Sequence, residues 1–515
     1  MKTSVENFAK SVPSRGRERQ RVDRENANEC PLAGARGYIG WSCMGRKFIH
    51  MRTLSFWLVS AVWLTASLAS AQPLRFGRAE VDITPPANMP FQVPQRPPFP
   101  VIVGTGAHDP LHAKAVLFES GGVKVAIVSC DMTSIPVDII AAARVQVGKV
   151  STVPPENVMV TATHTHTTPN IRPRFYPTAT PEQKKVAASY LEQLPKLIAE
   201  SVRLAEKSLT EAKLRAAIGT VPDVAFNRRF LMKDGTVLSN PGKGQDELLV
   251  NVVRPAGPTD PALPVLYAEG VDGNPLATVV NFAMHLDTTG GYEYSADFPY
   301  QISRILADVK GPEMLTHFTI GAAGNINHYY LLDPKNPRRT KGYQEAARIG
   351  TLIAAEVVRT YTRLQPLVTA PIKVSREVLR LLILEEKAPA LAKQFGNKPV
   401  YHDGELTVTL VDGKYTFEAE VMVVTIGDEL AFVGLPGEMF VELGLAIKQN
   451  SPYQFTYVNA LANGAIGYVA NRKALREGAY GASYATTRSN PGSGEALVDS
   501  AVRQLIAHRD MKPTP

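Results

Sequence analysis

Short apolar runs rich in β-branched residues recur along the chain. The clearest of them are 123–132, 157–164, 276–285 and 420–436. Continuous apolar runs of about four to eight residues, bounded by turn-forming residues, are typical of buried strands. The pattern therefore predicts a β-sheet core built largely from strands of this kind.

Longer segments with helical periodicity lie between these runs. Apolar residues that recur every three to four positions are typical of a helix with one face packed on a core. Because strands and helices are interleaved, we predict an α/β (mixed α+β) fold with sheets flanked by helices. The predicted helices span 137–150, 181–209, 343–361 and 494–509.

No repeat or low-complexity linker divides the chain after residue 71. We therefore expect one large domain over 72–515, with the polar, glycine-punctuated region 386–420 as an excursion from the sheet.

The first 71 residues have the character of processing sequence. A basic start at Met51-Arg52 leads into a short apolar run that ends in Ala69-Ser70-Ala71, the order of a signal peptide with its cleavage site. A membrane anchor is the alternative, but the run is short for a spanning helix. We interpret 51–71 as a signal peptide and 1–50 as a disordered leader or sequence upstream of the true start. Export to the periplasm, cell surface or medium follows, with no stable membrane anchor after cleavage.

Composition and charge narrow the function. The chain has 515 residues, of which 44% are hydrophobic and 20% are charged, as in globular proteins. Residues 1–71 contribute +6 of the net charge of +8, so the remaining chain is close to neutral. Charge therefore gives no support for nucleic-acid binding. The exported chain would keep only Cys130, which excludes an internal disulfide.

The sharpest chemical feature is the motif Thr163-His164-Thr165-His166, which directly follows an apolar run. If the strand continues through it, residues two apart face the same side, and both imidazoles enter one cleft. Two such imidazoles suit Zn²⁺. The alternative is a polar strand end whose histidines bond to the backbone. His285 ends another apolar run, and a lone histidine in such a place is often structural. Spacing alone does not select the remaining ligands.

Ten sequence blocks, in this order, resemble the catalytic domain of the neutral/alkaline, non-lysosomal ceramidase family. The resemblance covers roughly residues 75–505 and implies a ceramidase-like catalytic fold without the C-terminal immunoglobulin-like domain of full ceramidases. The blocks are 77–86, 108–118, 128–136, 157–170, 227–229, 281–291, 295–299, 321–327, 435–444 and 467–480.

That family hydrolyses the amide of N-acylsphingosine, a sphingolipid, at a zinc ion. The resemblance implies a Zn²⁺ cofactor held by His164, His285, Glu438 and Tyr468. Taken singly, Glu438 has the alternative of a carboxylate at a helix N-terminus, and Tyr468 that of a core aromatic.

Three further positions have implied roles in the same family. His166 should face the substrate or the attacking water, Arg228 should contact the substrate, and Tyr480 should lie near the metal site or the oxyanion. We expect Asp297 or Asp131 to orient a ligand or a base.

One block departs from the family. Asn327 stands where ceramidases have a serine that is important for amide cleavage. An asparagine cannot be a nucleophile, although its amide can hydrogen-bond a carbonyl or an oxyanion. We expect Asn327 and Tyr480 to stabilise the developing oxyanion.

The sequence thus predicts an exported zinc hydrolase that cleaves an amide or ester in a small-molecule or lipid-like acyl substrate. One alternative is a zinc hydrolase of the same fold that acts on a sugar derivative, an acylated polymer or a peptide. The other alternative is a binding protein that keeps the pocket without turnover.

Overall fold

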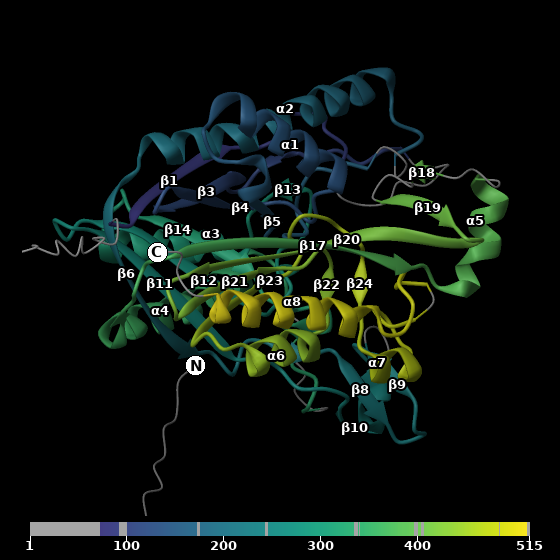
Figure 1. The fold of residues 1–515 in the computed structure, drawn as a ribbon. Coiled ribbons are helices and arrows are strands. Elements are labelled where there is room, and N and C mark those ends of the chain that lie inside the picture. Colours follow the sequence, from purple (N-terminus) through teal and green to yellow (C-terminus); the bar gives the residue numbers. More distant parts are fainter. Residues whose placement is uncertain are drawn as a thin grey trace, which may run out of the picture. The chain divides into compact units, whose positions relative to one another are not determined.

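A nine-stranded mixed sheet forms one layer of the protein (Figure 1), which is described here from a computed structural model. Its order is β14-β12-β11-β6-β1-β3-β4-β5, with β16 paired to β6. The pairs β12/β14 and β4/β5 are parallel and the other pairs are antiparallel. The strands are β1 (Arg75–Asp82), β3 (His112–Ser120), β4 (Val123–Cys130), β5 (Val158–Ala162), β6 (Thr210–Thr220), β11 (Ala262–Gly270), β12 (Pro275–Phe282), β14 (Leu315–Ile320) and β16 (Gln365–Pro366).

The structure describes residues 73–91, 100–172, 176–242, 246–333, 338, 340–395, 400–402, 406–483 and 485–511. These residues belong to one compact unit, Ala69–Pro515. The predicted leader, signal peptide and cleavage site lie outside the described residues. Within the described part of the chain, no helix is both long and apolar enough to cross a bilayer.

A second, six-stranded sheet has the order β18-β19-β20-β21-β23, with β17 paired to β20. The predicted run 420–436 is a hairpin rather than one strand, because the chain reverses at Gly427, whose φ is +59°. The strands are β17 (Ile372–Leu382), β18 (Val400–His402), β19 (Thr407–Val411), β20 (Lys414–Ile426), β21 (Leu430–Gly434) and β23 (Phe455–Asn459).

The two sheets pack against each other through a shared apolar core. Phe118 of the first sheet lies 5.9 Å, centroid to centroid, from Phe432 of the second, and Phe432 lies 5.0 Å from Tyr457. Buried side chains from both sheets form one continuous cluster around these rings. Such face-to-face packing leaves the outer face of each sheet to be covered by helices.

Helices cover those outer faces, as Figure 1 shows for α1 and α2 on one side and α6 and α8 on the other. The helices are α1 (Val137–Val150), α2 (Pro181–Lys207), α3 (Phe298–Lys310), α4 (Tyr343–Thr360), α5 (Ala388–Phe395), α6 (Val441–Asn450), α7 (Arg472–Glu477) and α8 (Ser493–Asp510). The predicted mixed α+β class with flanked sheets is therefore confirmed.

Local sequence explains where α2 begins and ends. Thr180 accepts a hydrogen bond from the backbone N–H of Gln183, whose side chain accepts one from the N–H of Thr180, and Pro181 occupies the first turn. This capping box satisfies helix N–H groups that otherwise lack partners. The helix ends at Lys207, two residues before the predicted end, because Thr210 already begins β6.

Nine short strands lie outside the two large sheets, among the residues that the structure describes. They are β2 (Gly106–Ala107), β7 (Phe226–Asn227), β8 (Arg229–Met232), β9 (Val237–Ser239), β10 (Val252–Pro255), β13 (Glu293–Tyr294), β15 (Ile326–Asn327), β22 (Glu438–Met439) and β24 (Tyr468–Val469). Two of the pairings, β22/β24 and β15/β7, bring distant parts of the chain to the same place.

Candidate metal centre

His164 reaches the site through a backbone turn and not through a continued strand. Strand β5 ends at Ala162, and His164 has a φ of +75°, in the left-handed region. The condition for the predicted alternation is therefore not met. Its ring is fixed by a 2.6 Å contact between Nδ1 and the carbonyl oxygen of Thr133. Because that oxygen is an acceptor, Nδ1 carries the proton and Nε2 presents its lone pair to the site.

His285 is oriented in the same way from the end of β12. Its Nδ1 lies 2.7 Å from the carbonyl oxygen of Ala323 and 3.1 Å from that of Ile326. The side chain is buried, with 1% of the residue exposed. Two backbone acceptors at Nδ1 leave Nε2 as the free, unprotonated nitrogen.

Glu438 and Tyr468 are brought together by the pairing of β22 with β24. These strands are parallel, and Glu438 lies directly opposite Tyr468 in the register. Glu438 lies in a strand three residues before α6 begins at Val441, so the alternative of a helix N-terminal carboxylate does not describe it. Tyr468 is 8% exposed.

These four side chains converge, and three of the distances between their ligand atoms are close to those in a tetrahedral zinc site. The Oε2 atom of Glu438 lies 3.3 Å from the Nε2 atoms of both His164 and His285. The hydroxyl of Tyr468 lies 3.5 Å from Nε2 of His285. Four ligands at about 2.0–2.1 Å from a tetrahedral zinc ion are separated from one another by about 3.3 Å. The donor types and their spacing therefore both fit zinc.

Electrostatics points to a cation at the same place. Oε2 of Glu438 is buried and has no hydrogen-bond donor among the described residues. It faces two imidazole lone pairs, so three electron-rich atoms meet at one place. The pKa of His285 is lowered by burial and by Arg228.

His166 lies beside the four converging groups. Its Nε2 is 3.4 Å from Nε2 of His164, and the ligand atoms of His164, His166 and His285 all lie within 4.8 Å of one another. Burial, and then the neighbouring His164, lower the pKa of His166 to about 3, which keeps the ring neutral near pH 7. The two imidazoles of the motif thus lie next to each other, with ring centroids 4.8 Å apart.

Arg228 and Tyr480 form a wall next to Tyr468. The guanidinium carbon of Arg228 lies 5.4 Å from the ring centroid of Tyr468 and 5.2 Å from that of Tyr480. Arg228 is buried, donates to the carbonyl of Gly324, and has an Nε without a hydrogen-bond partner in the described structure. Tyr480 is 50% exposed, so it faces solvent at the rim of the site.

Asn327 lies in β15 and is 1% exposed. Its Nδ2 donates to Oδ1 of Asn240 at 3.0 Å, and its Oδ1 accepts from the N–H of Tyr329 at 3.1 Å. Both ends of the amide are thus hydrogen-bonded within the protein. The second hydrogen of Nδ2 can still be donated to another acceptor.

The two aspartates expected to orient an imidazole make other contacts. Asp297 accepts hydrogen bonds from Thr288, Thr289 and Phe298, and Asp131 accepts one from the N–H of His112. Backbone carbonyls perform the orienting role for His164 and His285 instead. Carbonyl oxygens have no residue-specific signature, so sequence reasoning had no signal for them.

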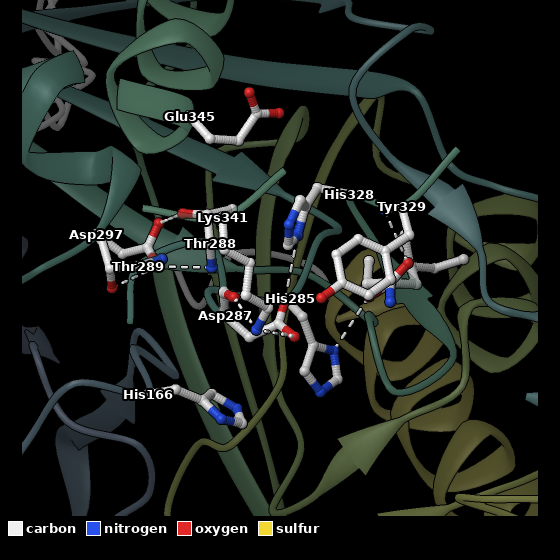
Figure 2. A network of polar contacts seen from close by, with 12 residues as sticks. His166, His285, Asp287, Thr288, Thr289, Asp297, His328, Tyr329, Lys341 and Glu345 are labelled. Atoms are coloured by element: carbon white, nitrogen blue, oxygen red, sulfur yellow. Dashed lines mark hydrogen bonds and ion pairs between the residues drawn. The ribbon is translucent and has the colours of Figure 1, made fainter. Parts of the chain in front are cut away.

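Sequence reasoning also missed a charged group at this site. Oδ1 of Asp287 lies 3.3 Å from Nδ1 of His328, and Oδ2 forms an ion pair with Lys341, as Figure 2 shows. The only sequence signal is its place two residues after His285, in the stretch His285-Leu286-Asp287.

The fold is similar to that of solved ceramidases. One is the neutral ceramidase from Pseudomonas aeruginosa, and another is a ceramidase complexed with C2; each aligns with 86% of this chain and 76% of its own, at a TM-score of 0.65 and 18% identity. No protein-family model matches the chain, and no curated protein matches it. The chain therefore has a ceramidase-like fold.

Proposed function

We propose that the protein is an exported zinc-dependent hydrolase that cleaves an amide or ester bond. The observation that supports the proposal is the convergence of His164, His285, Glu438 and Tyr468, with separations of 3.3–3.5 Å between three pairs of their ligand atoms. The ceramidase-like fold supports the same reaction class, and the resemblance of the sequence blocks supports the same ligand set. When bound, zinc would lower the pKa of a water ligand toward about 7 and polarise the substrate carbonyl.

The residues around the metal ligands have separate tasks in this proposal. Neutral His166 accepts a hydrogen bond from the attacking water and helps to transfer its proton. Arg228 places a buried positive charge, with a free Nε–H, where the carbonyl oxygen gains negative charge. Tyr480, at the exposed rim, contacts the part of the substrate that enters from solvent.

We propose a small or activated acyl substrate in preference to long-chain ceramide. Asn327 replaces the family serine, and the chain thereby loses a hydroxyl from that position. The loss of one positioning contact typically lowers the rate by about a hundred- to a thousand-fold. Short-chain N-acyl and O-acyl substrates should therefore be cleaved faster than ceramide.

A substrate panel, with zinc present and after chelation, tests the reaction. We expect turnover of short amides or esters that disappears on chelation and returns with zinc. Zinc uptake without turnover of any substrate would instead favour the binding protein. The specific observation behind that second candidate is the amide of Asn327, which is engaged at both ends.

A further inference from the structure

A carboxylate with no task in the mechanism above lies beside the metal centre. Asp287 follows His285 by two residues, in the loop after β12. Its Oδ1 is 3.3 Å from Nδ1 of His328, and its Oδ2 is 3.4 Å from Nζ of Lys341. Figure 2 shows the carboxylate between the rings of His328 and His285, and its charge also acts on His166. Asp287 is therefore close to the groups that would surround a reacting carbonyl.

A second buried aspartate nearby shows how incompletely Asp287 is bonded. The carboxylate of Asp297 accepts from the N–H groups of Thr288, Thr289 and Phe298, at 3.0, 3.0 and 2.7 Å, and from both threonine hydroxyls. Within the described structure, Asp287 accepts one long hydrogen bond, from Lys341, and its Oδ1 has none. A carboxylate offers about four acceptor positions, so Asp287 has several unused.

His328 and Lys341 leave one oxygen of Asp287 open. His328 is buried, and its Nε2 lies 3.0 Å from the carbonyl oxygen of Thr340. Its Nδ1 lies 3.3 Å from Oδ1 of Asp287, so the ring of His328 covers that oxygen. Lys341 donates at 2.7 Å to the backbone carbonyl of Asp287 and only at 3.4 Å to Oδ2. The side chain of Asp287 is 19% exposed. Oδ2 is thus the oxygen of Asp287 that can accept a hydrogen bond from a ligand.

We propose that Oδ2 of Asp287 accepts a hydrogen bond from the N–H next to the scissile carbonyl and so positions amide substrates. This inference rests on the proposed hydrolase function. An ionised carboxylate is an acceptor only, so it recognises a donor. An amide has a donor on the atom bonded to its carbonyl carbon, whereas an ester has an oxygen whose lone pairs would face the carboxylate. Asp287 therefore sets the preference of the site for amides over esters.

A matched substrate pair tests this role. Acetyl p-nitroanilide and p-nitrophenyl acetate share the acyl group and differ at the atom in question. In Asp287→Ala, we expect kcat/KM for the anilide to fall roughly ten- to hundred-fold further than that for the ester, as for a lost hydrogen bond to a charged group. Zinc content should stay at the unmodified level. Asp287→Asn keeps the side-chain volume and one acceptor oxygen, so kcat/KM for the anilide should fall less, relative to the ester, than in Asp287→Ala. If Asp287→Ala loses zinc, Asp287→Asn is used in its place.

Asp297→Asn is the matched control. It makes the same substitution at a nearby carboxylate whose oxygens already accept hydrogen bonds from Thr288, Thr289 and Phe298. It should lower the melting temperature and affect the anilide and the ester equally. Equal losses on both substrates in both Asp287 variants, with zinc retained, would overturn the positioning role alone. If the zinc-loaded, unmodified protein cleaves neither these two substrates nor any other amide or ester of the substrate panel, the proposed function and this inference are overturned together.

Discussion

The proposed zinc centre depends on single ligand residues. Oε2 of Glu438 is buried between two imidazoles and has no hydrogen-bond donor among the described residues, so a bound cation would supply the partner that this oxygen lacks. Glu438→Gln replaces that charge with an amide of the same size. Loss of a residue that only orients a ligand weakens metal binding by about ten- to hundred-fold. Because Glu438 is proposed to bind zinc directly, we expect the affinity of the variant for zinc to fall by at least that much. Competition with a zinc chelator measures the affinity. An unchanged affinity would mean that the metal, if bound, does not use this carboxylate.

A buried histidine away from the centre gives the protein a pH-dependent stability. Burial lowers the pKa of His317 from 6.5 to about 4. Because the folded-state pKa is the lower one, the unfolded chain binds the proton first, and stability is lost as the pH falls from about 6.5 towards 4. We expect the melting temperature to decline over this window, and less steeply in His317→Leu than in the unmodified protein. Identical slopes would show that His317 does not contribute to acid sensitivity.

At the scale of elements, the paired strands that hold Glu438 form the sensitive part of the site. Gly324 donates to the carbonyl of Met439 at 2.7 Å, and a Cβ on Gly324 would collide with the backbone carbonyl of Glu438. Gly324→Ala should therefore displace β22 and weaken zinc binding without altering any ligand. Gly290→Ala is the control, because a Cβ on Gly290 would meet no atom within 4 Å among the described residues. Equal zinc content and equal melting temperatures in the two variants would contradict this dependence.

The elements that were predictable from sequence are those with strong local signals. α1 begins and ends where the periodicity places it, and α2 begins at Pro181 after its capping threonine. α3 was not predicted, and the run 420–436 concealed a turn at Gly427. The two imidazoles of the motif were predicted to lie together through strand alternation, but a left-handed backbone at His164 brings them together instead, and no periodicity encodes such a turn. The pairing of Glu438 with Tyr468 depends on a contact between segments 30 positions apart, which only the resemblance indicated.

In the whole molecule, two packed sheets with helices outside place the proposed zinc centre at strand ends and loops. The β-strands supply a rigid frame, and the proposed ligands come from four separate segments. Metal binding to such a set also joins those segments, so part of the binding free energy stabilises the fold. We expect chelation to lower the melting temperature of the unmodified protein, with recovery on adding zinc. Equal melting temperatures before and after chelation would show that metal binding is not coupled to folding.

Export is a prediction about the chain as a whole. The basic start at Met51 and the small residues up to Ala71 predict cleavage before Gln72. N-terminal sequencing of the secreted protein should begin at Gln72 or within a residue or two of it. Recovery of the arginine-rich leader on the mature protein would contradict the prediction.

Elemental analysis of purified protein that begins at Gln72 measures the bound metal directly. We expect one zinc ion per chain in the unmodified protein. We also expect His164→Ala and His285→Ala each to lose the zinc, while the control variant Gly290→Ala keeps it. Full zinc occupancy in both histidine variants would contradict the proposed centre.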